Sequence, residues 1–401
     1  MSLRSGAFSR ERLGRMADVM RGYVDRGEVA GVVTLLCRHD EVHVEAIGRQ
    51  DLAAATPMRR DTVFRIASMT KPITAAAAMI LVEEAKLRLD DPVDRWLPEL
   101  ADRRVLRGID RPLDDTVPAH RPITLRDLLT FRLGVGAIME LPDRYPIQKA
   151  MTEAGLAPRP DPLPFSTDEF LARLGRLPLM HQPGERWMYH TGSDVLGALI
   201  ARATGMTLGD FLQERIFAPL GMKDTAFNVP ESTLGRLATC YQFGTGRLAV
   251  YDEARGGRWS RPPAFHSGGG GLASTADDYL AFARMLLSRG RYGKERMLAR
   301  PTVELMTSDQ LTEEQKAASP FAPGFWNSHG WGFGLSVITG RDGVGPSSGS
   351  FGWDGGFHTS CYVDPQEDMI AILLAQRLMT SPSPSDFYTD FWTLAYQAID
   401  D

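Results

Sequence analysis

Ser68 and Lys71 are the pair of residues in this chain whose types and spacing best suit nucleophilic catalysis. They stand where a strand-like stretch, residues 62–67, gives way to an alanine-rich helix. Residues three apart on a helix share one face, so the serine hydroxyl and the lysine amine can meet. A desolvated lysine can remove the hydroxyl proton of a serine and so activate it as a nucleophile. The pair therefore predicts a covalent acyl-serine intermediate.

The expected place of Ser68 at a helix N-terminus favours the same chemistry, because free N–H groups and the helix dipole stabilise developing negative charge there. Lys71 must lose its proton to act as a base. Lowering its pKa from ~10.4 to near 7 costs roughly 4–5 kcal/mol, which burial and a neighbouring cation can supply. The competing interpretation is a helix-capping serine followed by a solvated lysine. Other parts of the sequence are needed to distinguish the two interpretations.

Tyr189 is the candidate proton carrier. It lies in a turn-rich stretch, residues 182–192, directly before a predicted helix. Most tyrosines in such places are packed by their ring. Near lysine charges, however, a phenol can become a phenolate and act as a base. Together with Ser68 and Lys71, Tyr189 completes a set that can move a proton.

Residues 350–356 contain the candidate oxyanion site and a candidate substrate contact. Gly355 and Gly356 let a strand edge approach another group, and an N–H at that edge can donate to an oxyanion. Trp353 offers an apolar face suited to uncharged acyl or alcohol groups. The alternative for this segment is a plain turn before the strand at 359.

Three other patterns carry no predicted function. Residues 345–349 match Gly-x-Ser-x-Gly, but no helix follows Ser347 as a nucleophile elbow requires. His39 and His43 lie in a predicted hairpin without a third ligand, so no metal site is predicted. The glycines at 268–271 permit close backbone approach, but no Gly-Lys-Ser/Thr follows as in a phosphate-binding loop.

The elements that must position these residues follow from apolar periodicity and from turn residues. Strands and end helices bracket a mostly helical middle, which indicates an α+β fold, an antiparallel sheet with helices on its faces and a helical insertion. We expect an α/β domain of residues 1–85 and 212–401 and a mostly helical domain of residues 86–211. The predicted helices are 8–26, 74–86, 123–129, a short piece around 147–155, 167–177, 195–204, 208–216, 275–288 and 387–399. The predicted strands are 31–37, 42–47, 331–338, 359–363 and 369–374.

Composition excludes several classes of protein. The chain has 401 residues and a net charge of −5, so nothing indicates a nucleic-acid or anionic-membrane partner. Three widely spaced cysteines without a Cys-x-x-Cys motif fit a reducing compartment. The N-terminus lacks the apolar run of a signal peptide, and no stretch approaches the ~18 apolar residues of a membrane span. We expect a cytoplasmic protein that needs no cofactor, with its oligomeric state undetermined.

At Ser68, Lys71, Tyr189 and residues 350–356 the chain resembles the serine β-lactamase and penicillin-binding-protein superfamily. The resemblance is closest to the family VIII carboxylesterases, which are similar to class C β-lactamases. It covers most of the chain, because several landmarks occur in the right order. These are the Ser-x-x-Lys context at 64–78, residues 123–129, residues 183–189 with 194–197, residues 218–222 and residues 268–278.

The resemblance implies a β-lactamase-like fold and a role for each candidate residue. Ser68 would be the acylated nucleophile, and Lys71 and Tyr189 would share the general-base and general-acid work. The backbone N–H groups of Ser68 and Gly356 would form the oxyanion hole. Tyr189 stands at the tyrosine of the family's Tyr-x-Asn motif, where Thr191 replaces the asparagine.

Residues 353–355 stand where β-lactamases carry Lys-Thr-Gly, and the family VIII esterases are similar to this chain in having tryptophan there. With Trp353 in place of that lysine, the chain lacks the cation that would hold a β-lactam carboxylate, which favours an esterase. We therefore expect a serine carboxylesterase that hydrolyses short uncharged esters through acyl-Ser68. The open alternatives are an acyltransferase using the same acyl-enzyme, a weak β-lactamase or D,D-peptidase, and a non-catalytic penicillin-recognising binding protein.

Overall fold

The computed structural model describes residues 6–139, 143–381 and 383–401 and contains one large antiparallel sheet. Its strand order is β12-β13-β14-β15-β16-β1-β2-β3. The central strands β1 and β16 are buried along their whole length, which is why their sequences are almost continuously apolar. The strands are β1 (Gly31–Arg38), β2 (Glu41–Asp51), β3 (Thr56–Pro57), β12 (His329–Trp331), β13 (Ser336–Ile338), β14 (Phe351–Gly355), β15 (Thr359–Asp364) and β16 (Met369–Ala375).

The sheet joins the two ends of the sequence. β1 pairs with β2 in the predicted N-terminal hairpin, and on its other side it pairs with β16 from the C-terminal part. β16 in turn pairs with β15, and β15 with β14. The predicted hairpin and the two predicted C-terminal strands are therefore confirmed, and the pairing carries β14 into the same sheet.

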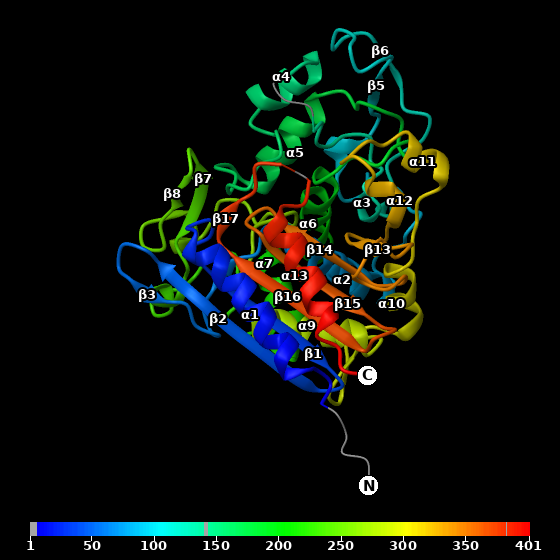
Figure 1. Cartoon of the computed structure of the whole chain (residues 1–401). Coiled ribbons are helices and arrows are strands. Elements are labelled where there is room, and N and C mark those ends of the chain that lie inside the picture. The colour runs from blue at the N-terminus through cyan, green and yellow to red at the C-terminus, as the bar shows by residue number, and fades with distance from the viewer. Residues whose placement is uncertain (1–5, 140–142, 382) are drawn as a thin grey trace.

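The two terminal helices cover one face of this sheet and pack on each other, as Figure 1 shows. They are α1 (Arg10–Asp25) and α13 (Asp386–Gln397), and both match predicted helices. The Tyr23 hydroxyl donates to Asp390 at 2.7 Å across this contact. On the other face α9 (Ala276–Leu287) packs against β1, β15 and β16. The sheet is thus enclosed on both sides.

One strand prediction was wrong. Residues 331–338 form two short strands, β12 and β13, rather than one. The chain reverses between them, and Gly334 has a φ of +69° that suits glycine. A Cβ at Gly332 would overlap the Met306 carbonyl oxygen. The alternating pattern of the sequence cannot show a turn that depends on these tertiary contacts.

The helical middle lies at one end of the sheet, with α4, α5, β5 and β6 farthest from it in Figure 1. Thr124 caps α3, as predicted, by accepting a hydrogen bond from the Asp127 backbone N–H. The middle contains β5 (Arg104–Leu106), β6 (Thr116–Pro118), α3 (Leu125–Leu129), α4 (Pro146–Glu153), α5 (Thr167–Arg176) and α6 (Thr191–Thr204). The expected antiparallel sheet with flanking helices and a helical insertion is confirmed.

One hydrophobic core runs through both parts of the molecule. It includes Leu35 on β1, Leu128 on α3 and Leu171 on α5. Between them lies α2 (Thr70–Glu83), in which every residue from Thr70 to Leu81 is buried. Boundaries at 85/86 and 211/212 stay a prediction, because this core crosses them.

Smaller elements complete the chain. A two-strand pair of β4 (Phe64–Arg65) and β9 (Ala273–Ser274) leads toward α2, and a small sheet contains β17 (Arg377–Leu378), β7 (Cys240–Gly244) and β8 (Arg247–Asp252). The rest are α7 (Leu208–Leu212), a π turn at Gln213–Phe217, α8 (Ala218–Leu220), β10 (Arg291–Tyr292), β11 (Glu295–Arg296), α10 (Arg300–Met306), α11 (Glu313–Ala317), α12 (Phe325–Ser328) and 3-10 turns at Ala67–Met69, Pro98–Leu100, Leu234–Arg236 and Arg258–Ser260.

Within the described ranges, no single helix has the length and apolar character needed to cross a membrane. One bent pair, Thr191–Thr204 with Leu208–Leu220, meets the criteria of length and composition when its two helices are taken together.

Candidate active site

Ser68 lies in the 3-10 turn Ala67–Met69, directly before α2 begins at Thr70. Ala67 has a φ of +43°, a left-handed conformation that costs a non-glycine residue about 1–3 kcal/mol. This bend separates β4 from the helix and leaves Ser68 half-buried at the head of α2. The expected place of Ser68 at a helix N-terminus is confirmed.

The predicted meeting of Ser68 and Lys71 is present in the structure. The Lys71 Nζ donates to the Ser68 Oγ at 2.8 Å and to the Gly269 carbonyl oxygen at 2.5 Å. Lys71 is completely buried. Burial lowers the pKa of Lys71 to about 7, while the charge of Asp194 acts in the opposite direction. A large fraction of the amine is therefore neutral near pH 7 and can accept a proton.

The glycine-rich loop at 268–271 makes the close approach that the sequence predicts. A Cβ at Gly268 would come within 2.5 Å of the Ser193 carbonyl oxygen at the start of α6. Only a glycine fits there, and it brings the Gly269 carbonyl oxygen onto Lys71. The loop therefore binds a lysine of the chain itself.

Tyr189 lies beside this pair. Its ring centroid is 4.6 Å from the Lys71 Nζ, and its hydroxyl accepts a hydrogen bond from the Trp353 Nε1 at 2.7 Å. Burial raises the pKa of Tyr189, although hydrogen bonds with Ser68 and Trp353 act against the rise. The phenolate form of Tyr189 that the sequence suggested is disfavoured, because burial and the nearby Asp354 charge raise its pKa and Lys71 is charged in only part of the molecules near pH 7.

His190 and Asp194 also belong to the site, and sequence reasoning missed both roles. The His190 Nδ1 lies 3.2 Å from the Lys71 Nζ, and its Nε2 lies 3.1 Å from the Asp194 Oδ2. The other Asp194 oxygen accepts hydrogen bonds from the Ser267 Oγ at 2.7 Å and the Gly269 N–H at 2.9 Å. The available signal was their four-residue spacing at the predicted start of a helix.

The electrostatics of this pair oppose protonation of the histidine. Burial, followed by the Lys71 charge, lowers the pKa of His190, and Asp194 compensates only partly. Burial alone would raise the pKa of Asp194. Hydrogen bonds from the His190 Nε2–H, the Ser267 hydroxyl and the Gly269 N–H outweigh burial and hold the pKa of Asp194 below its usual range. The pair is therefore a neutral imidazole beside a carboxylate.

The end of the β14–β15 hairpin, which holds the other predicted residues, packs against the turn that carries Ser68. A Cβ at Gly355 would overlap the Ile66 carbonyl oxygen and the Thr359 Oγ1. The Thr359 hydroxyl donates to the same Ile66 carbonyl at 3.1 Å. Gly356 follows in the turn, and its carbonyl accepts a hydrogen bond from the Met379 N–H at 2.8 Å. The hairpin end is thus fixed against the turn that carries the nucleophile.

Asp354, next to Trp353 on β14, is half-buried, and its carboxylate points to the opposite face of the sheet. Its Oδ1 accepts hydrogen bonds from the Ser360 Oγ at 2.6 Å and the Tyr388 hydroxyl at 2.5 Å. Burial raises the pKa of Asp354 to about 6. Its charge therefore changes near the lower end of the physiological range.

Aromatic side chains surround Tyr189 and Trp353. Phe321 lies 5.3 Å from Tyr189 and 6.1 Å from Trp353 between ring centroids. We call five of these aromatic residues the aromatic wall. They are the half-buried Tyr189, Phe321, Phe325 and Trp326 and the buried Trp353. Beneath it lie the buried rings of Phe131, Trp187 and Trp331. The half-buried rings of the wall offer apolar contact area beside Tyr189.

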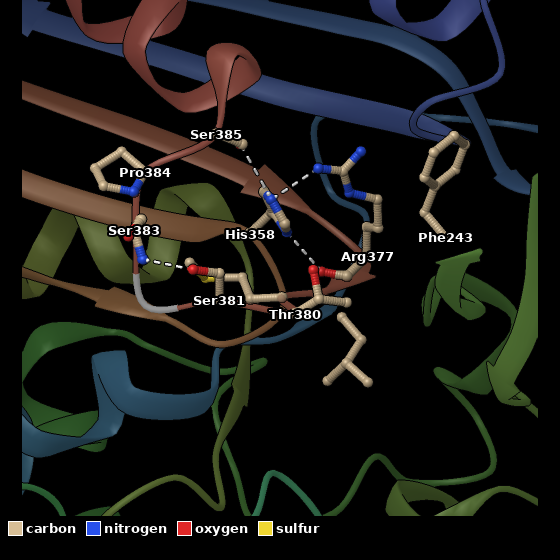
Figure 2. A pocket seen from close by; sticks show the side chains of 10 residues that line it. Phe243, His358, Arg377, Thr380, Ser381, Ser383, Pro384 and Ser385 are labelled. Carbon is tan, nitrogen blue, oxygen red and sulfur yellow. Dashed lines mark hydrogen bonds between the residues drawn. The ribbon is translucent and has the colours of Figure 1, made fainter. Parts of the chain in front are cut away.

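A separate pocket of about 240 Å³ lies behind the β14–β15 turn (Figure 2). His358 projects into it and contacts the Arg377 carbonyl, the Arg377 guanidinium and the Ser385 hydroxyl. Burial, followed by the Arg377 charge, lowers the pKa of His358 to about 4. The pocket contains neither Ser68 nor Lys71 in its lining, and its neutral histidine connects the turn to the start of α13.

The family model described as Beta-lactamase matches residues 16–391. The chain belongs to the Beta-lactamase family. Similar relatives include Protein Rv1367c of Mycobacterium tuberculosis (strain ATCC 25618 / H37Rv), 42% identical over 89% of this chain and 88% of that protein. Esterase EstB of Burkholderia gladioli is 32% identical over 86% of each chain.

A solved structure supports the same assignment within the Beta-lactamase family. EstCE1, described as a hydrolase with promiscuous acyltransferase activity, is similar with a TM-score of 0.79 and 25% identity, over 96% of this chain and 99% of that one. The expected β-lactamase-like fold and the resemblance to the esterases of this superfamily are confirmed. The chain is a serine hydrolase of the Beta-lactamase family.

Proposed function

We propose that this chain is a serine carboxylesterase of the family VIII type that hydrolyses short uncharged esters through an acyl-Ser68 intermediate. The observation that carries the proposal is the hydrogen bond between the Ser68 hydroxyl and a fully buried Lys71 with a lowered pKa. Such an amine is neutral in a large fraction of molecules near pH 7, which a general base requires.

In acylation, Lys71 takes the Ser68 proton while the Ser68 Oγ bonds to the ester carbonyl carbon. The backbone N–H groups of Ser68 and Gly356 donate to the oxyanion that forms. The bond to the alcohol oxygen then breaks, and Tyr189 gives that oxygen its proton. Tyr189 recovers a proton from the Lys71 ammonium. The products of this step are the free alcohol, the acyl-serine and a neutral lysine.

In deacylation, water takes the place of the alcohol. Lys71 accepts a proton from the attacking water, and the water oxygen bonds to the acyl carbon. When the Ser68 ester bond breaks, the Lys71 ammonium returns the proton to the Ser68 Oγ. The carboxylic acid leaves, and the site regains its starting protonation.

The preference for uncharged esters rests on Trp353 and the aromatic wall. Trp353 stands where β-lactamases of this superfamily carry a lysine. Its indole is buried and its Nε1–H is already bonded to Tyr189, so it offers no charge to a substrate carboxylate. Aromatic faces instead favour apolar acyl or alcohol groups. A small-molecule ester is the proposed substrate, with no nucleic-acid or membrane partner.

A second candidate function is acyl transfer to an alcohol other than water. The aromatic wall beside Tyr189 supports it, since an apolar alcohol gains contact area there that water does not use. The description of EstCE1 as a hydrolase with promiscuous acyltransferase activity is in line with this candidate. Product analysis with added alcohols separates transfer from hydrolysis.

The deciding experiment compares Ser68→Ala with Ser347→Ala in turnover of p-nitrophenyl esters of increasing acyl length, with nitrocefin included. Ser347 is the matched control, because it is the buried serine of the Gly-x-Ser-x-Gly pattern. We expect ester turnover to be abolished in the first variant and kept in the second. Near wild-type turnover by Ser68→Ala contradicts the esterase. Faster turnover of nitrocefin than of any ester favours the β-lactamase alternative.

A fluorophosphonate probe tests the alternative of a non-catalytic binding protein. The Ser68 Oγ attacks phosphorus, fluoride leaves, and Lys71 takes the serine proton. We expect labelling at Ser68, located by peptide mass spectrometry. An unlabelled Ser68 favours a penicillin-recognising binding protein without catalysis.

Two further predictions, on the domain boundaries and on the cellular compartment, belong to the same proposal. We keep residues 86–211 as the helical domain and residues 1–85 with 212–401 as the α/β domain. We also propose the cytoplasm as the compartment. The three cysteines support it, because Cys37, Cys240 and Cys361 are all free and buried.

A further inference from the structure

A line of three side chains runs from the nucleophile into the interior. Lys71 contacts Ser68 on one side and His190 on the other, and His190 contacts Asp194. A carboxylate accepts hydrogen bonds only, so the His190 Nε2 carries the proton that it shares with Asp194. The Nδ1 of the neutral ring is then an acceptor facing the Lys71 Nζ, which donates.

The backbone at His190 is strained in a way that serves this contact. His190 has φ +81° and ψ −63°, and the Thr191 N–H donates to the Tyr189 carbonyl at 3.2 Å across it. This is a γ-turn with positive φ, which is rare for a residue with a side chain. Such strain costs about 1–3 kcal/mol and persists where the surrounding structure holds it. It places Tyr189 and His190 on the same lysine.

We propose that His190, oriented by Asp194, is a positioning residue that holds the Lys71 amine toward Ser68. The inference rests on the proposed function, in which Lys71 is the base. Neutral Lys71 has two N–H donors and one lone pair. With the Gly269 carbonyl and the His190 Nδ1 taking the two donors, the lone pair is left for the Ser68 hydroxyl.

The same arrangement accommodates the ammonium that forms when Lys71 takes the Ser68 proton. Its three donors match the Ser68 Oγ, the Gly269 carbonyl and the His190 Nδ1. The Asp194 charge lies one hydrogen bond beyond the imidazole and favours the ammonium. No proton needs to leave the lysine for the histidine, so His190 acts through hydrogen bonding alone.

The groups that face Lys71 and His190 come from four elements. Lys71 itself lies on α2, Asp194 on α6, and Tyr189 directly before α6. The loop at 267–269 contributes the Ser267 hydroxyl and the Gly269 backbone. The β14 strand contributes the Trp353 indole and, at longer range, the Asp354 charge, which acts on Tyr189.

The first test reads the tautomer of His190 directly. In ¹⁵N-resolved spectra of imidazole-labelled protein, assigned by difference with His190→Gly, we expect a neutral ring protonated on Nε2 near pH 7. In Asp194→Asn this preference is lost, because an amide can either donate or accept. A wild-type ring protonated on Nδ1 overturns the proposal. This measurement needs no substrate.

The second test follows the rate of Ser68 phosphonylation against pH. On the acid side, the rate falls as Lys71 becomes protonated, and we call this part of the profile the acid limb. We expect its midpoint near pH 7 in the wild type and about one unit lower in Asp194→Asn, since a lost negative charge disfavours the ammonium. The matched control is Asp364→Asn, which changes another buried, hydrogen-bonded aspartate. It leaves the limb in place. An unmoved limb in folded Asp194→Asn overturns the proposal.

His190→Gly keeps the proposal testable if Asp194→Asn does not fold. Glycine adopts φ +81° without the strain of a side chain, which offsets part of the loss of the His190 contacts, and a thermal melt checks that the variant folds. We expect phosphonylation above pH 8 to fall about tenfold, and a wild-type rate overturns the inference. Absence of ester turnover in a protein whose Ser68 is labelled contradicts the esterase but leaves this inference standing.

Discussion

At the scale of single residues, burial assigns different proton-transfer roles to Lys71 and Tyr189. Burial disfavours the charged form of any group, so it lowers the pKa of a lysine and raises that of a tyrosine. Lys71 is therefore a base that is neutral in a large fraction of molecules near pH 7, and Tyr189 stays a phenol that can give a proton. The same apolar surroundings thus supply an acid and a base within reach of Ser68.

The pKa of Lys71 gives the first prediction. The amine acts as a base only when unprotonated, so kcat/KM for ester hydrolysis rises with pH through an apparent pKa of about 7. Asp354, with a pKa raised to about 6 by burial, is a second group that titrates in this range. Steady-state kinetics from pH 5 to 9 on the wild type and on Asp354→Asn separate the two. If the rise of kcat/KM with pH disappears in Asp354→Asn, the rise belongs to the aspartate, which contradicts the role of Lys71.

The hydrogen bond from Trp353 to Tyr189 gives the second prediction. Trp353→Phe keeps a ring but loses the Nε1–H that holds the Tyr189 hydroxyl. Loss of one such bond costs about 1 kcal/mol, so kcat/KM falls about fivefold. Trp331→Phe is the matched control, because the buried Trp331 Nε1 has no hydrogen-bond partner in the described part of the chain. Equal losses in the two variants would indicate packing alone.

At the scale of elements, the site is formed where two short structures meet: the turn with Ser68 and the end of the β14–β15 hairpin. The bent Ala67 backbone directs the chain from β4 into α2, and Thr359 holds the Ile66 carbonyl in place. Gly355 allows this contact, because any side chain there would overlap Ile66 and Thr359. The oxyanion donors proposed for Ser68 and Gly356 depend on this closeness.

Gly355→Ala tests the meeting of the two elements. The added methyl group must displace the Ile66 carbonyl and the Thr359 side chain, which moves the turn that carries Ser68. We expect kcat to fall about 100-fold or more, as when an oxyanion donor is lost. Gly340→Ala is the control, since a Cβ there has nothing within 4 Å. Ester turnover close to wild type in Gly355→Ala would show that the hairpin end is not required for catalysis.

At the scale of the whole molecule, a buried ion pair connects the small sheet to the strand before the nucleophile. Arg65 on β4 donates to Asp252 on β8 at 2.6 Å and 2.9 Å, and both side chains are almost fully buried. Arg65 also donates to the Ala238 carbonyl at 2.6 Å and to Gln376 at 3.1 Å. The pair therefore fixes three distant parts of the chain around β4.

Asp252→Ala leaves the Arg65 charge buried without its carboxylate partner. Removing one member of a buried pair lowers the free energy of unfolding by about 3–5 kcal/mol. The exposed pair of Arg300 and Glu304 is the control, and Glu304→Ala changes stability by less than about 1 kcal/mol. Urea denaturation of the wild type and both variants measures the difference. A loss in Asp252→Ala no larger than in Glu304→Ala contradicts the account.

The sequence by itself predicted the main helices, the N-terminal hairpin and the C-terminal strands, and it predicted that Ser68 and Lys71 meet. These follow from local causes, since periodicity, caps and motif spacing act over a few residues. Only the tertiary structure decided that Tyr189 stays protonated and that His190 faces Lys71. It also showed that residues 331–338 turn back on themselves. A pKa depends on burial, and burial depends on segments far apart in the chain that meet only after folding.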